Sequence, residues 1–308
     1  MTNSFKNESI KGAITQFTSL VFYARIKFFI FSMLIFCTFK INAQCSKCVQ
    51  TDTTNSILIP GTIQRAPIPY SNLREGDVMW AKRIWRTIDL REKLNQPYYY
   101  PEVSNNGSSS LFDLIKCGVL QGCIYAFDNP VTDDEFKDKM ELEEIASLLI
   151  QKEIVELEDP NNPGTYFKDT ITLEINSTDI IAYWIKEEWF FDKQRSVMDV
   201  RIIGLCPLST KKDPTTGEVL GFRPLFWVYF PQLRPILAKQ RVFVQNNFST
   251  PSTYDDLFQK RYFSSYIHKE SNVFDRTINS YMSGVDAVLE SEKVKESISN
   301  LESDLWQF

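Results

Sequence analysis

Two series of alternating apolar residues in the middle of the chain constrain its fold more than any other feature. Apolar side chains occupy every second position in each series, apart from Glu187: Ile181, Tyr183, Ile185, Trp189 and Phe191, then Met198, Val200 and Ile202. A period of two places these side chains on one face of a β-strand. Because the intervening DKQRS is turn-like, the pattern predicts a long β-hairpin over Ile181–Ile203.

The flanking segments complete an α+β pattern. Gly221–Phe230 is apolar enough for a central strand, with Pro224 at a bulge or edge. Cys123–Asp128 is a further predicted strand, and helical spacing is recognisable in the acidic segment Asp133–Asp159. The fold class that follows is α+β: an antiparallel sheet flanked by helices and preceded by an extended N-terminal arm.

Cap residues predict where several helices begin. Ser110 can cap a short helix that ends near Gly118, and Thr253 with Asp256 matches a capping box. Pro231 suits the first turn of another helix. Near the C-terminus an apolar stripe at helical spacing indicates a last helix, formed by Val294, Ile298, Leu301 and Leu305.

Leu73–Pro101 reads as an amphipathic helix followed by an extended exit. At one hundred degrees per residue, one arc carries Trp80, Ala81, Ile84, Trp85, Ile88 and Leu94, and the opposite side carries Lys82, Arg86, Asp89 and Lys93. Asn72 with Glu75 can cap this helix and Gln96-Pro97 can end it. The tryptophans are therefore expected to face inward and Arg86 outward.

Three charged residues lie in apolar company in this reading. Asp77 and Arg91 project onto the apolar arc, and Glu187 lies on the apolar face of its strand. A buried charge is costly unless paired, so Arg91 is predicted to meet Asp77 or Glu187, or to face a subunit interface. Aromatic and arginine side chains anchor interfaces, which makes the candidate partner contacts Arg86, Arg91, Tyr98, Tyr99, Tyr100, Trp80 and Trp85.

The N-terminus is typical of a secretory signal peptide over residues 1–43. Arg25 and Lys27 precede the apolar run Phe28–Phe39, which is too short to span a bilayer, and Ala43 offers a cleavage site. The long stretch before Arg25 suggests a translation start downstream of Met1. Cleavage before Cys45, with lipid attachment, is the rival reading. Residues 44–72 then form a polar, proline-containing arm, and 73–308 a single domain.

Charge and cysteines bear on the environment. The formal net charge is −5 for the whole chain and about −9 after cleavage, which favours basic partners over nucleic acid. In an oxidising periplasm the near pairs Cys45/Cys48 and Cys117/Cys123 can each close a disulfide, leaving Cys206 unpaired, although the sequence leaves the pairing open.

The residues for common catalytic chemistry are missing from the sequence. His268 is the one histidine of the chain, which argues against Ser-His and Cys-His nucleophiles and against histidine-rich metal sites; it is expected at the surface or hydrogen-bonded. The segment Asp159–Gly164 imitates a calcium loop, but Pro163 and Thr170 replace required ligands, so it reads as a turn. We expect no catalytic residues, metal or cofactor; a carboxylate-type hydrolase acting on glycan or peptide remains the alternative.

Four segments resemble one known family: Leu73–Pro101, Trp189–Leu208, Leu225–Pro231 and Asp255–Arg276. They are similar to the gliding-motility protein GldN family, called PorN in relatives that do not glide. The resemblance implies a non-catalytic periplasmic subunit of the type IX secretion system. It also implies a ring formed with the outer-membrane lipoprotein GldK (PorK), self-association in that ring, and contact with the periplasmic region of the motor protein GldM (PorM).

Overall fold

The computed structural model describes residues 48–49, 65–104, 108–128, 130–131, 135–158, 166–212, 219–242 and 252–306. All of them belong to one compact unit, Cys48–Phe308. The predicted signal peptide, most of the predicted arm and the predicted turn at Asp159–Gly164 lie outside the described residues.

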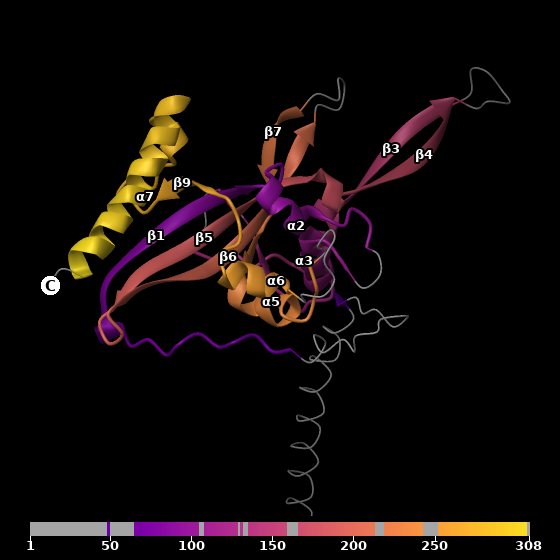
Figure 1. The fold of residues 1–308 in the computed structure, drawn as a ribbon. Helices are drawn as coiled ribbons and strands as arrows, with labels where there is room; N and C mark the ends of the chain where they lie inside the picture. Colours follow the sequence, from indigo (N-terminus) through magenta and orange to yellow (C-terminus); the bar gives the residue numbers. More distant parts are fainter. Residues whose placement is uncertain are drawn as a thin grey trace, which may run out of the picture. The chain divides into compact units, whose positions relative to one another are not determined.

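In the described part of the chain, seven strands form one sheet in the order β2, β8, β6, β5, β1, β9, with β7 also paired to β6 (Figure 1). Their bounds are β1 Val78–Asp89, β2 Ala126–Phe127, β5 Ile180–Asp192, β6 Val197–Lys212, β7 Val219–Pro224, β8 Trp227–Tyr229 and β9 Tyr266–Glu270. Every strand pair in this sheet is antiparallel. β5 and β6 pair down to Asp192 and Val197, which confirms the predicted hairpin and the α+β class.

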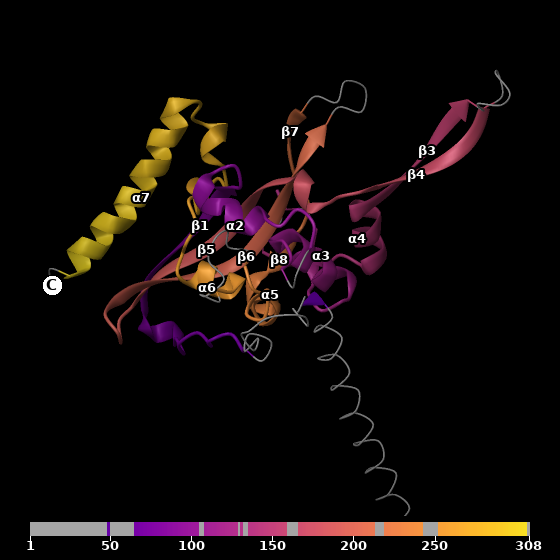
Figure 2. The ribbon, with the colours of Figure 1, turned by 45° about the vertical axis from the view of Figure 1, so that its right-hand side comes forward.

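A second, two-stranded sheet is made by β3 (Ile150–Glu158) and β4 (Tyr166–Glu174). Both views show this hairpin reaching away from the main sheet (Figure 1, Figure 2). It follows directly on α4 (Leu142–Leu149), the helix predicted within the acidic segment.

The expected single strand over Gly221–Phe230 is two strands. β7 ends at Pro224, and β8 begins at Trp227, with both pairing to β6 at different heights. Proline has no N–H to donate to a ladder, so the pairing of β7 stops at Pro224.

The helices flank the sheet. Besides α4, they are α2 Gln96–Tyr99, α3 Leu111–Leu120, α5 Phe230–Leu237, α6 Tyr254–Gln259 and α7 Val285–Trp306, with 3-10 turns η3 Glu75–Asp77, η4 Lys93–Asn95, η5 Ser177–Asp179 and η6 Ile278–Ser280. Two of the predicted caps are confirmed: the Ser110 side chain accepts a hydrogen bond from Asp113 N, and Thr253 with Asp256 forms a capping box.

The predicted amphipathic helix over Leu73–Pro101 is wrong: its centre is strand β1. Burial on both faces explains the error, because all five residues from Ile84 to Ile88 are buried and show no alternation. Asn72 caps nothing, since η3 has Arg74 at its N-cap position. The Gln96-Pro97 pair begins helix α2 instead of ending one, and the exit is extended only from Tyr100 onward.

Two apolar clusters lie on the same face of β1. Ile88 belongs to the large cluster under α3, α5 and α6, whereas Ile84 packs with Ile298 and Val294 of α7. Because Ile84, Arg86 and Ile88 are two residues apart, they share one face of the strand. Figure 1 shows α7 beside β1 and β9, apart from α5 and α6. Arg86 therefore lies at the seam between the two clusters.

Candidate functional site

A buried ion network occupies this seam, and Glu187 is its centre. Glu187 of β5 is fully buried and lies opposite Ile84 of β1 in the sheet register. Its carboxylate receives the Trp189 indole N–H, with Nε1 to Oε2 3.0 Å apart. This is the residue that interrupts the apolar alternation of its strand, so the sequence does mark its position.

Two arginines share that one carboxylate. Arg86 Nε lies 3.1 Å from Glu187 Oε2. Arg261 Nη2 lies 2.8 Å from Glu187 Oε1 and donates to Oε2 at 3.1 Å. The trio carries a net charge of +1, with most of it removed from water, and such an arrangement is stable only where the charges compensate one another closely.

Arg261 reaches the network through an unusual backbone. It comes after Lys260, the C-cap of α6, and has φ of 52°, the left-handed conformation that usually holds glycine after a helix. A non-glycine residue there costs on the order of 1 kcal/mol. The side chain offsets that cost, because its guanidinium meets Glu187 and lies 5.3 Å from the centre of the Trp189 ring.

The charge balance sets the electrostatics of the seam. Burial lowers the pKa of the Arg86 guanidinium, Glu187 opposes that effect and the positive charge of Arg261 adds to it. Arg86 Nε is within ion-pair distance of Glu187 but is not aligned to donate to it, and Arg261 Nη1 is likewise a buried donor without a hydrogen-bond acceptor among the described residues. Two cationic donors are thus incompletely satisfied.

A cavity of about 490 Å³ opens beside these donors. Arg86 and Trp189 of the sheet line it, together with Arg261 after α6 and Lys295 and Glu302 of α7. The cavity thus lies where α7 meets the rest of the domain, next to the ion network.

The other predicted contact residues are scattered over the domain. Trp85 and Tyr98 are buried, Trp80 and Tyr99 are half-buried, and Tyr100 is exposed. Arg86 is buried, so its expected outward orientation is wrong, because β1 is a covered strand. A role of these residues in partner contacts stays a prediction.

Arg91 does not meet Asp77 or Glu187. Its side chain is 72% exposed and forms a 2.5 Å ion pair with Asp89. The prediction failed because it placed Arg91 on a helix, whereas the residue follows β1 in a turn and reaches a carboxylate two positions back.

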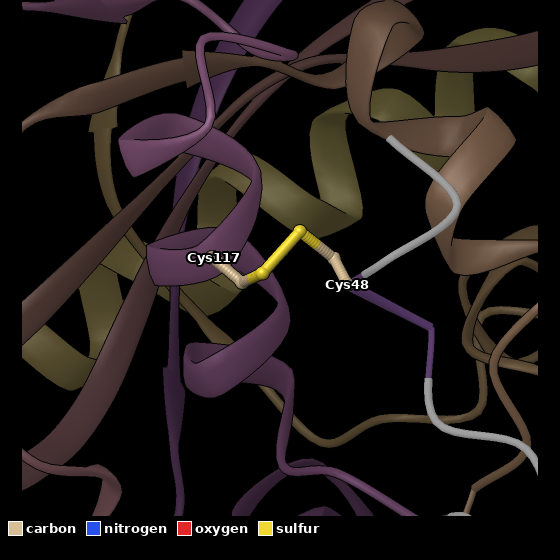
Figure 3. Close-up of a disulfide and its surroundings, with 2 residues drawn as sticks. All are labelled: Cys48 and Cys117. Atoms are coloured by element: carbon tan, nitrogen blue, oxygen red, sulfur yellow. A yellow bond between two sulfur atoms is a disulfide. The ribbon is translucent and has the colours of Figure 1, made fainter. Parts of the chain in front are cut away.

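A disulfide joins Cys48 to Cys117 of α3 (Figure 3). The two cysteines are 69 residues apart in sequence, so the near pairing of Cys45 with Cys48 and of Cys117 with Cys123 is wrong. Cys123 is disulfide-bonded as well, and Cys206 is free and buried. The helix that Ser110 caps brings Cys117 to a segment that is remote in sequence.

The single histidine is a buried structural group. His268 of β9 is hydrogen-bonded through Nδ1 to the Thr87 hydroxyl at 2.9 Å and stacks on Trp184, which confirms the hydrogen-bonded expectation. Burial, with a smaller contribution from Lys269, lowers its pKa to about 3. The imidazole is therefore neutral at physiological pH.

Two kinds of feature are absent from the described residues. Among those residues, there is no group of three or more His, Cys, Asp or Glu side chains that could hold a metal ion. None of the helices there has the length and apolar character needed to cross a bilayer.

Fold and site together define an α+β protein in which an open antiparallel sheet carries a buried arginine–glutamate network against a C-terminal helix. The chain belongs to the family of gliding motility associated protein GldN, whose profile matches residues 73–307. It is therefore a component of the gliding-motility machinery. No curated protein matches the chain.

Proposed function

We propose that this protein is a non-catalytic structural subunit of the type IX secretion and gliding machinery in the periplasm. In this proposal it forms a ring with the outer-membrane lipoprotein GldK, which also holds it at the outer membrane, and it contacts the motor protein GldM. Membership in the GldN family is the observation that carries the proposal.

The surface of α7 supports an assembly role. Three apolar side chains on one side of its first turns are largely exposed: Val285 at 74%, Val288 at 62% and Leu289 at 55%. Spacing of three and four residues places them on one helix face, here named the α7 apolar face. The preceding Val273 and Phe274 are exposed too. Concentrated apolar exposure of this kind marks protein–protein interfaces.

Co-purification with the lipoprotein tests the proposal. The exported, processed protein is expected to elute as a large assembly with GldK and as a small species without it. Elution that is the same with and without GldK contradicts the ring. A clean deletion should abolish type IX secretion without rescue by any extracellular product, whereas retained secretion overturns the proposed role.

A pair of variants tests the α7 apolar face itself. Val288→Asp is expected to reduce assembly with GldK, because it places a charge on a surface that burial would desolvate. Val131→Asp is the matched control, since Val131 is exposed to a similar extent at 67% and lies outside this face. Equal assembly by both variants argues against an interface at the α7 apolar face.

A further inference from the structure

Among the residues that line the cavity between the ion network and α7, cations outnumber carboxylates. Three cations line it, Arg86, Arg261 and Lys295, against one lining carboxylate, Glu302. Glu187 neutralises one of the two arginines, and Lys295 lies 3.3 Å from Glu292 on the same helix. Charge is thus left over at the arginine end of the cavity.

The hydrogen bonding of the two arginines at this end is incomplete or weak. Arg261 Nη1 is buried without an acceptor in the part of the chain that the structure describes. The Arg86 Nη1 donates to the Ser265 hydroxyl over a long 3.3 Å. A buried cationic donor without an acceptor is costly, and an anion close to the two guanidinium groups lowers the electrostatic part of that cost.

Apolar walls restrict the kind of anion. Leu94, Trp189, Phe263 and Ile298 contribute to the lining, and the volume of about 490 Å³ lies in the range of sites for organic ligands. An isolated inorganic ion would leave most of this space and the aromatic surface unused. The lining suits an apolar group that carries one charged end.

We propose that this cavity is a binding site for a peptide carboxylate that is flanked by an apolar side chain. The planar guanidinium fork of arginine matches a carboxylate. The net charge of +1 on the Arg86, Arg261 and Glu187 trio matches a monoanion, and Glu302 on the α7 side disfavours a second negative charge. The inference goes beyond the proposed assembly role and does not depend on it.

The Trp189 indole is a reporter within the site, because its N–H donates to Glu187 and Trp189 lines the cavity. Its proton–nitrogen NMR signal, assigned with Trp189→Phe, is followed in the processed, isotope-labelled protein. The probes are N-acetyl-leucyl-phenylalanine, the same peptide with a C-terminal amide, and inorganic phosphate. We expect the titration of this signal to give the peptide acid an affinity at least tenfold higher than that of the peptide amide or of phosphate.

Two outcomes of these titrations overturn the proposal. If acid and amide bind equally, the charge is not recognised. If phosphate binds as tightly as the peptide acid, the cavity is a general anion site and not one for an apolar carboxylate.

Variants locate the binding within the cavity. Arg261→Gln removes one guanidinium and is expected to weaken binding of the peptide acid at least tenfold. Arg83→Gln is the matched control, since Arg83 lies on β1, is half-exposed and pairs with Glu188 outside the cavity lining; its affinity should equal that of the unmodified protein.

A cavity-filling variant keeps the charges intact. Ser299 is an exposed residue of α7 that lines the cavity, so Ser299→Phe occupies the space without removing an ion pair and should also abolish the shift. It decides the matter even if Arg261→Gln disturbs folding. Binding of the acid by the Ser299→Phe protein with unchanged affinity overturns the proposed site.

Discussion

Glu187 and Arg261 are 74 residues apart in sequence, yet the Arg261 guanidinium meets both oxygens of the Glu187 carboxylate, at 2.8 and 3.1 Å. One residue lies in the middle of a strand and the other follows a short helix. Together with Arg86 they join the end of α6 to the sheet. The three residues lie between the two apolar clusters on that face of the sheet.

Glu187→Gln should destabilise the protein strongly. The change keeps the shape of the side chain but leaves Arg86 and Arg261 without a counter-charge in a buried place, a loss of about 3–5 kcal/mol in the free energy of unfolding. Urea denaturation measures it. Glu188→Gln is the control, because Glu188 forms a half-exposed pair with Arg83, which is worth about 1 kcal/mol or less. Equal losses for the two variants would show that the network does not stabilise the fold.

Arg234 of α5 should hold the segment that precedes β1 against the domain. Its guanidinium makes two hydrogen bonds with Asp255, donates to the Ile68 carbonyl at 2.7 Å and lies 4.4 Å from the Tyr70 ring centre. Arg234→Ala strands a buried carboxylate, so we expect a loss of about 3–5 kcal/mol and faster hydrogen exchange around Tyr70.

The matched control for Arg234 is Arg91→Ala. Arg91 is mostly exposed and its ion pair is local, so its removal should change stability by about 0.5 kcal/mol or less. A large effect there would restore the idea that Arg91 occupies a buried or interfacial place.

His268 predicts a loss of stability in acid. Its folded pKa of about 3 lies below the usual value of 6.5. Below pH 6.5 the imidazole therefore binds a proton in the unfolded chain but not in the folded chain. The contribution of the neutral imidazole to the free energy of unfolding is complete above pH 6.5. It declines by up to about 1.4 kcal/mol per pH unit towards pH 3.

Two measurements check this. The imidazole NMR signal, unambiguous because the chain has one histidine, should not titrate between pH 8 and 4.5; a midpoint near 6.5 would contradict the burial. The His268→Gln protein should lack the histidine-dependent part of the pH slope in urea denaturation.

The Cys48–Cys117 disulfide should stabilise the domain substantially. It closes a loop of 69 residues, and the loss of such a cross-link typically costs about 2–5 kcal/mol. The double variant Cys48→Ser/Cys117→Ser avoids a free thiol, and thermal unfolding compares it with the unmodified chain. Non-reducing peptide mapping should recover the two cysteines in one linked pair; recovery of Cys117 linked to Cys123 would contradict the structure.

Local patterns predicted a good part of the fold. The β5–β6 hairpin follows from alternation of side chains, and the starts of α3 and α6 follow from Ser110 and Thr253. Such signals depend on residues within a few positions of one another, because strand pleat and helix caps are local geometry. The interruption of one apolar series by Glu187 also indicated a charged residue on a buried face, and Glu187 is fully buried.

Strand β1 shows where local patterns fail. Trp85 and Ile88 sit at helical spacing, but they are buried on opposite faces of a strand in the interior of the sheet. A strand covered on both sides has no alternation, so its periodicity does not distinguish it from a helix. Strand or helix was settled here by pairing with β5 and β9.

The residues therefore specify the fold class, the central hairpin, several caps and the family through near-neighbour patterns that need no knowledge of the whole chain. The partners of Glu187, the link from Cys48 to Cys117 and the cavity against α7 depend on segments far apart in sequence. Many pairings of charges and thiols are open to an unfolded chain, and folding selects among them by burying apolar clusters and bringing compensating charges together.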